Sequence, residues 1–385
     1  MLHERLTRRG LLRLGAGMGI AAGAGATLAG CSSNGPEEAQ SPAEPAPGQT
    51  VVTAVRGSDL AAMAREALEA VGGIGAIVHE GESVFIKPNM VTLGWASIGR
   101  DAFKTGECTK PEILAAVAEE CIRAGASRVT IGDGSQMSNF SWEYATTLDG
   151  STNLYQEVKR LNAQYGEKVH LACLDVDSPS WVDVPTKTSL GTIAVSSLVA
   201  EADRVISIPV LKTHQWAQLT LSLKNFVGTT PLARYQAKTD GTLPRIGLHL
   251  AGIEQVFLDI VAGVKPDLAI IDCSICVEGD GPSAGPERGE TVDMRVRNGS
   301  WLLLAGTDLV AVDATAARMI NHDVWTTRQL TMAYEQGLGE IREEAIRLDG
   351  ARLEELRVEW EPATPADPTQ LSRSHFTPAY HLGIA

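Results

Sequence analysis

Three basic side chains lie in an otherwise apolar stretch between Ile208 and Gly228. Lys212 and His214 are two residues apart, so in an extended chain their side chains share a face. If residues 215–226 form a helix, Lys224 lies about 80° around the axis from His214, at ~3.6 residues per turn. Amines close to an imidazole bind anions and transfer protons. We therefore predict that His214, Lys224 and Lys212 are the catalytic residues.

Lys224 is the most informative residue for this prediction. A buried ammonium is costly unless it is paired or functional, and the surrounding segment 219–228 contains no carboxylate. In one interpretation Lys224 anchors a cofactor or stabilises negative charge, with His214 as a general base or ligand. In the other, Lys224 extends to solvent from a helix end.

Further polar side chains directly follow apolar segments that are typical of strands. These are Lys87 and Asn89 after residues 83–86, Asp133 after 129–132, Glu278 and Asp280 after 268–277, and Asp308 after 302–307. Parallel strands present their carboxyl ends at one edge of a sheet, so we expect these groups around one crevice. We predict that Lys87, Asn89, Asn225 and Asp133 bind a cofactor. Lys87, with Lys212, would also suit an anionic substrate.

The segments that must position these residues alternate between strand and helix patterns. Residues 50–56 and 83–89 are typical of strands, and an amphipathic helix is predicted within 58–73. Thr109–Glu112 resembles a capping box, and one long helix is expected within 247–264. This alternation predicts an α/β fold whose mostly parallel sheet has helices on both faces, as one unit or as two interleaved lobes.

At these residues the chain resembles domain-of-unknown-function family 362. The resemblance rests on five motifs in order: Ile86–Asn89, Pro209–His214, Leu223–Gly228, Gly279–Pro282 and Asp308–Asp313. It covers about residues 50–350 and implies an α/β domain that we place at residues 50–385. Some relatives carry ferredoxin-like cysteine clusters, which this sequence lacks.

A second resemblance is more distant. Lactate racemase-like proteins also have a histidine some ten residues before a lysine that precedes a glycine-bearing turn, and their lysine anchors a nickel-bearing nucleotide. His214 and Lys224 reproduce this spacing, and His249 would add an imidazole. The resemblance implies a related α/β architecture and a pocket centred on lysine and histidine. Separately, we expect either a divalent metal or a nucleotide-type cofactor to be bound there.

A metal site is predicted from Glu278, Asp280 and His249. Glu278 and Asp280 stand in a glycine- and proline-rich loop, where they either share a cation or are solvated. His249 lies in an apolar helix, where a core position is the alternative. Asp308 has the position of a helix N-cap, and Asp313 lies on either a buried or an exposed helix face.

The cysteines suggest a third chemistry. Cys273 and Cys276 have the spacing of a redox or metal pair, but no second pair accompanies them. Buried structural thiols are the favoured interpretation, with an iron–sulfur role as the weaker one.

The N-terminal residues predict a destination outside the cytoplasm. Residues 7–13 form a twin-arginine export motif, and Leu28–Cys31 resembles a lipobox. We predict a signal peptide at 1–30, a lipid on Cys31 and a disordered tether at 31–49, with the alternative that the signal is cleaved elsewhere. The expected partners are the twin-arginine machinery and, through the lipid, a membrane on the exported side of the cell envelope.

Composition narrows the functional classes. The 385 residues carry a formal net charge of −14, which argues against a nucleic-acid partner. We expect a metal- or cofactor-dependent enzyme that acts on a small anionic substrate. The alternatives are a non-catalytic envelope protein that binds an anionic ligand and an iron–sulfur-associated redox accessory protein.

Overall fold

The computed structural model describes residues 49–98, 101–236, 244–286 and 288–365. The predicted signal peptide, Cys31 and the predicted tether up to residue 48 lie outside the described residues.

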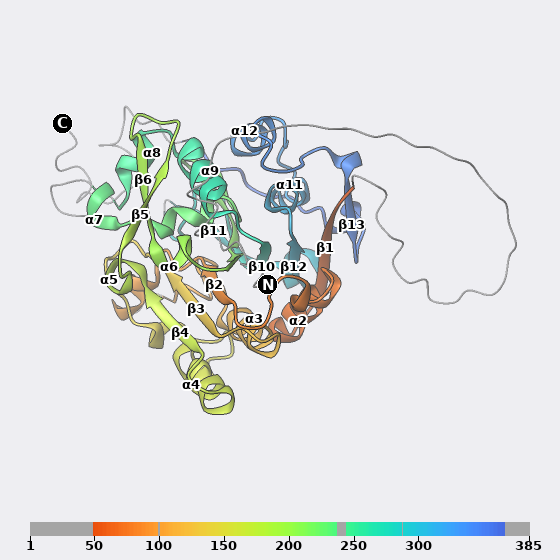
Figure 1. The fold of residues 1–385 in the computed structure, drawn as a ribbon. Coiled ribbons are helices and arrows are strands. Elements are labelled where there is room, and N and C mark those ends of the chain that lie inside the picture. The colour runs from red at the N-terminus through yellow and green to blue at the C-terminus, as the bar shows by residue number, and fades with distance from the viewer. Residues whose placement is uncertain (1–48, 99–100, 237–243, 287, 366–385) are drawn as a thin grey trace, which may run out of the picture.

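One large sheet organises the described part of the chain (Figure 1). From β10 (Leu268–Glu278) to β4 (Val169–Cys173) the neighbouring strands run parallel, whereas β12 (Trp301–Gly306) is antiparallel to both β10 and β1 (Thr50–Gly57). The prediction of a mostly parallel α/β sheet is therefore confirmed. The main path is β13 (Ile346–Asp349), β1 (Thr50–Gly57), β12 (Trp301–Gly306), β10 (Leu268–Glu278), β7 (Arg204–Ile208), β2 (Ser83–Pro88), β3 (Arg128–Asp133) and β4 (Val169–Cys173).

The long strand β10 lies at the centre of the sheet, between β12 and β7, and it is buried along its whole length. Its nearly continuous apolar sequence is typical of a strand that is covered on both faces. Its first residues pair with β7, and its later residues pair with β8 (Val210–His214) and β11 (Glu290–Asp293). β8 turns back into β9 (Gln218–Thr220), so β10 positions the segment that contains Lys212 and His214.

Helices cover both faces of the sheet (Figure 1). α2 (Leu60–Ala70), α3 (Pro111–Arg123) and α4 (Leu154–Tyr165) pack side by side as one layer. The other layer contains α9 (Ile253–Val264), α11 (Leu309–Met319) and α12 (Arg328–Glu335). Each long helix turns an apolar face to the sheet, as α2 does with Leu60, Met63 and Ala67.

Shorter elements connect these layers. A separate two-stranded ribbon, β5 (Trp181–Pro185) and β6 (Thr192–Ser196), packs against α9.

No helix among the described residues has the length and apolarity needed to cross a membrane. The remaining helices are α5 (Leu174–Asp177), α6 (Ser197–Ala200), α7 (Leu232–Tyr235), α8 (Ile246–Leu250), α10 (Met294–Asn298) and α13 (Leu353–Leu356), with 3₁₀ turns η1 (Ile74–Ala76), η2 (Leu93–Ile98), η3 (Trp142–Tyr144), η4 (Lys224–Thr229) and η5 (Glu343–Ala345).

The helix considered for residues 215–226 does not form. The chain instead reverses after His214 and pairs β9 with β8, with Thr220 opposite Lys212. This hairpin places the backbone of 218–220 in the sheet, and only the 3₁₀ turn η4 follows. The angle of about 80° between His214 and Lys224 therefore does not apply.

The capping box predicted at Thr109–Glu112 does not form. Lys110, and not Thr109, is the N-cap residue of α3, and Glu112 accepts a hydrogen bond from the Leu148 N–H across 2.7 Å instead of closing a capping box. The long helix predicted within 247–264 is present as α9, which begins at Ile253. The residues before it form the separate short helix α8, because Gly252 adopts a positive φ of 101° between the two.

Candidate functional site

A cavity of about 150 Å³ lies where the segments after β2, β3 and β8 meet η4, α8 and the loop at 280–283. The structure brings most of the predicted site residues together here. Lys212 and Glu278 are the predicted residues that do not line the cavity, whereas the residues that do are Lys87, Asn89, Asp133, His214, Lys224, Asn225, His249 and Asp280.

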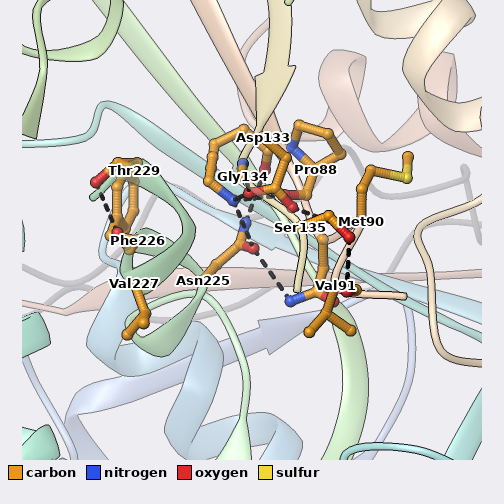
Figure 2. A network of polar contacts seen from close by, with 12 residues as sticks. Pro88, Met90, Val91, Asp133, Gly134, Ser135, Asn225, Phe226, Val227 and Thr229 are labelled. Carbon is orange, nitrogen blue, oxygen red and sulfur yellow. Dashed lines mark hydrogen bonds and ion pairs between the residues drawn. The ribbon is translucent and has the colours of Figure 1, made fainter. Parts of the chain in front are cut away.

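Lys87 and Asp133 form a buried ion pair at one wall of the cavity. Lys87 Nζ lies 2.5 Å from Asp133 Oδ1 and donates to the Pro88 carbonyl oxygen across 2.8 Å. The same carboxylate accepts hydrogen bonds from the backbone N–H groups of Met90 and Gly134 (Figure 2). Both charges are thus satisfied by the protein itself.

Gly228 is required by this ion pair. A Cβ atom at Gly228 would lie 2.1 Å from Asp133 Oδ1 and 3.0 Å from Lys87 Nζ. The terminal glycine of the segment after Lys224 is therefore explained by the close approach of the η4 backbone to the pair, and not by a positive φ.

Asn225 connects the strand ends to η4. Its Nδ2 donates to the Lys87 carbonyl oxygen across 2.7 Å and to Ser207 Oγ across 3.1 Å. Its Oδ1 lies 3.4 Å from both Lys87 Nζ and Asn89 Nδ2. Asn225 thereby fixes the position of the residue that precedes it, Lys224.

Lys212 lies behind the cavity wall. It is fully buried and donates to Asn89 Oδ1 across 2.9 Å and to the Glu107 carbonyl oxygen across 2.7 Å. Burial lowers the pKa of Lys212 to about 8, although the charges of Cys108 and Glu107 oppose this change. Its two hydrogen bonds and its absence from the cavity lining indicate a supporting position.

Lys224 differs from the other buried amines. It is only 9% exposed and lines the cavity, yet its amine has neither a hydrogen bond nor an ion pair with any described residue. Burial lowers the pKa of Lys224 to about 7, and the positive charges of Lys212 and Lys87 add to this effect. At neutral pH the amine is therefore divided between its charged and neutral forms.

Asp313 holds the backbone just before Lys224. This carboxylate is fully buried and accepts from the Ser222 N–H across 2.8 Å, from Ser222 Oγ across 2.5 Å and from the Leu223 N–H across 3.0 Å. Of the two interpretations of Asp313, the buried one is confirmed. Asp308 caps α11 by accepting from the Ala311 N–H, and it does not line the cavity because β12 runs opposite to β10.

The two histidines that line the cavity differ in whether Nε2 carries the proton or the lone pair. The Trp216 N–H donates to His214 Nδ1 across 3.0 Å, so a neutral His214 carries its proton on Nε2. His249 Nδ1 lies 3.1 Å from the Arg245 carbonyl oxygen, which can only accept, so the lone pair of His249 is on Nε2. The rings are stacked with centroids 6.1 Å apart. Burial lowers the pKa of both, that of His249 to about 3, so both are neutral at pH 7.

The residues predicted to bind a metal do not form one donor cluster. Glu278 pairs with Arg297 at 2.8 Å and accepts from the Glu361 N–H, and it is absent from the cavity lining. Asp280 lines the cavity and accepts from the Thr364 N–H across 2.6 Å. Throughout the described ranges, no group of three or more His, Cys, Asp or Glu residues has the arrangement of a metal site.

The cysteine pair lies in the core. Cys273 and Cys276 are free, buried thiols in β10, and burial raises the pKa of each above its ordinary value. Reactive cysteines instead have lowered pKa values and partial exposure. The structural interpretation of this pair therefore fits its surroundings better than the redox one.

Sequence reasoning missed Arg245 and Trp216, which also line the cavity. Arg245 pairs with Asp175 at 3.0 Å and donates to the Ser135 carbonyl oxygen across 2.6 Å. The Trp216 ring packs edge-on against His249, with centroids 5.6 Å apart. The position of Trp216 two residues after His214 was a usable signal, whereas nothing in the sequence around Arg245 distinguished it from a surface arginine.

The chain matches one protein family and resembles a protein from a cyanobacterial genus, Synechocystis. The model of the domain of unknown function DUF362 matches residues 84–318. A thylakoid-associated protein from Synechocystis is 26% identical over 289 residues, which cover 74% of this chain and 76% of that protein.

Two solved structures also resemble the chain. The lactate racemase apoprotein from Thermoanaerobacterium thermosaccharolyticum has 13% identity and a TM-score of 0.32, with 64% of this chain and 54% of that chain covered. A Thermotoga maritima protein has 12% identity and a TM-score of 0.32, covering 72% and 57%. The chain thus spans little more than half of each solved structure.

Proposed function

The chain belongs to the DUF362 family of unknown function, and we propose that it is an enzyme that binds a small anionic substrate at Lys224. The observation that carries this proposal is the buried amine of Lys224, which lines the cavity without a partner among the described residues. An anion placed beside it would supply the missing charge and compensate for part of its burial.

The charge balance of the cavity supports an anion at this position. Lys87 is neutralised by Asp133, and Arg245 by Asp175. The other charged residues that line the cavity are Asp280 and Arg288. Lys224 pairs with no carboxylate among the described residues, and it is repelled by Lys212 and Lys87. An anionic ligand therefore gains attraction from Lys224 in surroundings where water screens it poorly.

The size of the cavity favours a small ligand. A volume of about 150 Å³ suits a molecule of roughly benzene size. Carboxylates of a few carbon atoms, or a phosphate, meet this limit. We therefore propose a small carboxylate or phosphate as the substrate.

The groups around the ligand have distinct chemical roles. Lys224 attracts the anion when protonated and acts as a base or nucleophile when neutral. Neutral His214 offers an N–H donor on Nε2 because its Nδ1 is occupied by the Trp216 N–H. The lone pair of His249 Nε2 accepts a hydrogen bond from the ligand. The proposed general-base role of His214 is thus replaced by that of a donor.

The described residues do not fit a metal that is held by protein ligands alone. His249 offers one imidazole lone pair and Asp280 one carboxylate, whereas His214 Nδ1 is engaged and Glu278 is paired with Arg297. No third donor joins His249 and Asp280 among the described residues. No step of the proposed reaction is therefore assigned to such a metal. A cofactor that anchors at Lys224 stays a prediction, with Asn89 and Asn225 as neighbouring polar groups.

A calorimetric titration tests this function. The full chain is titrated at pH 6.5 with acetate and, separately, with inorganic phosphate. We expect saturable binding of at least one anion by the wild type and by Lys159→Met, which removes an exposed lysine. Lys224→Met should lose this binding. Equal binding by the wild type and Lys224→Met would remove Lys224 from the proposed site.

A non-catalytic capture protein is the second candidate. The observation in its favour is that Lys224 has no hydrogen-bonded acid or base beside it among the described residues. In that case His214→Ala changes anion affinity, and no product appears from any bound anion. Conversion of a bound anion by the wild type, lost in His214→Ala, favours the enzyme.

We also propose export by the twin-arginine route and lipid attachment at Cys31. The support is the sequence of residues 7–13 and Leu28–Cys31. Growth with a radiolabelled fatty acid should label the full-length protein in the envelope fraction. Cys31→Ala should lose the label, and its retention would refute the attachment site.

A further inference from the structure

We propose that the substrate carries a carbonyl group next to its anionic group, as a small 2-oxo acid does, and that this carbonyl condenses with Lys224 to form an imine. This inference rests on the proposed anion site and adds the class of substrate.

Four lysines are buried in the described part of the chain, and their partners distinguish Lys224 from the other three. Lys87 pairs with Asp133, and Lys110 pairs with Asp272 at 3.3 Å. Lys212 donates to Asn89 and to the Glu107 carbonyl oxygen. An amine that is held as a charged donor has no lone pair for attack on carbon. Within the described ranges, Lys224 is the buried lysine whose amine carries no such bond.

The position of Lys224 supports the same conclusion. Its side chain lines a cavity large enough for a short oxo acid, whereas Lys110 and Lys212 are sealed within the protein. The low pKa of Lys224, caused by burial, leaves about half of the amine neutral at pH 7. An exposed lysine with an ordinary pKa is neutral in only about one molecule in 2,500 at this pH.

Other cavity groups suit the two ends of an oxo acid. Arg288 lines the cavity, and its planar guanidinium suits a carboxylate. Neutral His214 offers its Nε2–H, and a hydrogen bond from it to the carbonyl oxygen would draw electrons from the carbonyl carbon. His214 keeps its proton throughout, because the alternative would be an imidazolate.

The condensation balances without another reactant. The nitrogen lone pair of neutral Lys224 forms a bond to the carbonyl carbon, and the carbonyl oxygen takes up a proton from water. The nitrogen then releases one proton to water, which leaves a neutral carbinolamine. The hydroxyl group takes up a proton from water and leaves as a water molecule while the nitrogen lone pair forms the C=N bond, and the nitrogen finally releases its second proton to water. The net change is one carbonyl and one amine converted to one imine and one water, with no oxidation or reduction.

Reductive trapping tests the proposal on the full chain. The protein is incubated at pH 7 with pyruvate and sodium cyanoborohydride, and the modified lysine is located by peptide mass mapping. We expect one adduct, at Lys224, formed at least about tenfold faster than at the exposed lysines, because the buried amine of Lys224 is partly neutral at pH 7. Acetone, which lacks the carboxylate, should label Lys224 far more slowly, and acetate should compete with pyruvate.

Two variants and one binding measurement show what the labelling result means. Lys224→Met should lose at least about nine-tenths of the adduct, and Lys159→Met should retain it. Lys224 labelled no faster than exposed lysines would overturn the imine proposal. If calorimetry then still detects acetate at Lys224, the anion site stands without the imine. If neither acetate binding nor an adduct depends on Lys224, both proposals fail.

Discussion

Replacing Lys224 with methionine should stabilise the protein below pH 7. The unfolded lysine has a pKa near 10.5, whereas burial lowers the pKa of the folded residue to about 7. This difference corresponds to about 5 kcal/mol of unfavourable free energy for the charged, buried amine. Methionine has a similar length and carries no charge, so Lys224→Met removes this cost. No described residue loses a hydrogen-bond partner.

The stability difference between Lys224→Met and the wild type should decrease as the pH rises. Between pH 7 and pH 10.5 the unfolded lysine holds a proton that the folded one has released, so the wild type gains stability as the pH rises through this window. The variant lacks this contribution. The stability advantage of Lys224→Met should therefore be largest below pH 7, up to about 5 kcal/mol, and disappear toward pH 10.5.

Urea unfolding at pH 6, 8 and 10, followed by circular dichroism, measures this difference. Lys212→Met is the matched control, because it also removes a buried amine of lowered pKa. It should give no comparable gain, since it leaves Asn89 Oδ1 and the Glu107 carbonyl oxygen without their donor, at about 1–3 kcal/mol each. A Lys224→Met protein that is less stable than the wild type at pH 6, or equally shifted at all three pH values, would refute the reasoning.

Further predictions concern the surroundings of Lys224. Gly228→Ala should lower the unfolding free energy by about 3 kcal/mol in urea, because its Cβ would collide with Asp133; an unchanged midpoint contradicts this. Asp313→Asn should cost about 2 kcal/mol and weaken acetate binding in calorimetry, because an amide cannot accept all three hydrogen bonds to Ser222 and Leu223; unaltered affinity argues against its positioning role. Glu278→Gln should cost about 1 kcal/mol and leave acetate binding intact, since Glu278 pairs with Arg297 outside the cavity; lost binding would return Glu278 to the site.

The strands could be predicted from sequence because their signals are local. β12 is a short apolar run, β10 is a long and nearly continuous one, and β2 ends at Pro88, which lies between Lys87 and Asn89. The rule that polar groups follow parallel strands then brought Lys87, Asn89 and Asp133 to one place. The same rule misplaced Asp308, because periodicity does not reveal that β12 runs antiparallel to its neighbours.

Long-range contacts explain the other errors. Residues 215–226 have an apolar pattern that suits a helix, but pairing with β8 places 218–220 in a strand. Glu278 looked like a metal ligand because the sequence does not show Arg297 beside it. The decisive property of Lys224, an amine without a partner among the described residues, depends on what surrounds it in space. A sequence can indicate that such a lysine is unusual and cannot show whether a carboxylate reaches it.

The most direct test of the anion site is the pKa of the Lys224 amine, measured with and without an anion. Competitive labelling with acetic anhydride across pH 5–11, with peptide mass mapping, reports the neutral fraction of each lysine. We predict a pKa of about 7 for Lys224 in the free protein and a clear rise of this pKa in saturating acetate. A pKa near 10.5 that acetate does not change would contradict an anion-binding lysine in this cavity.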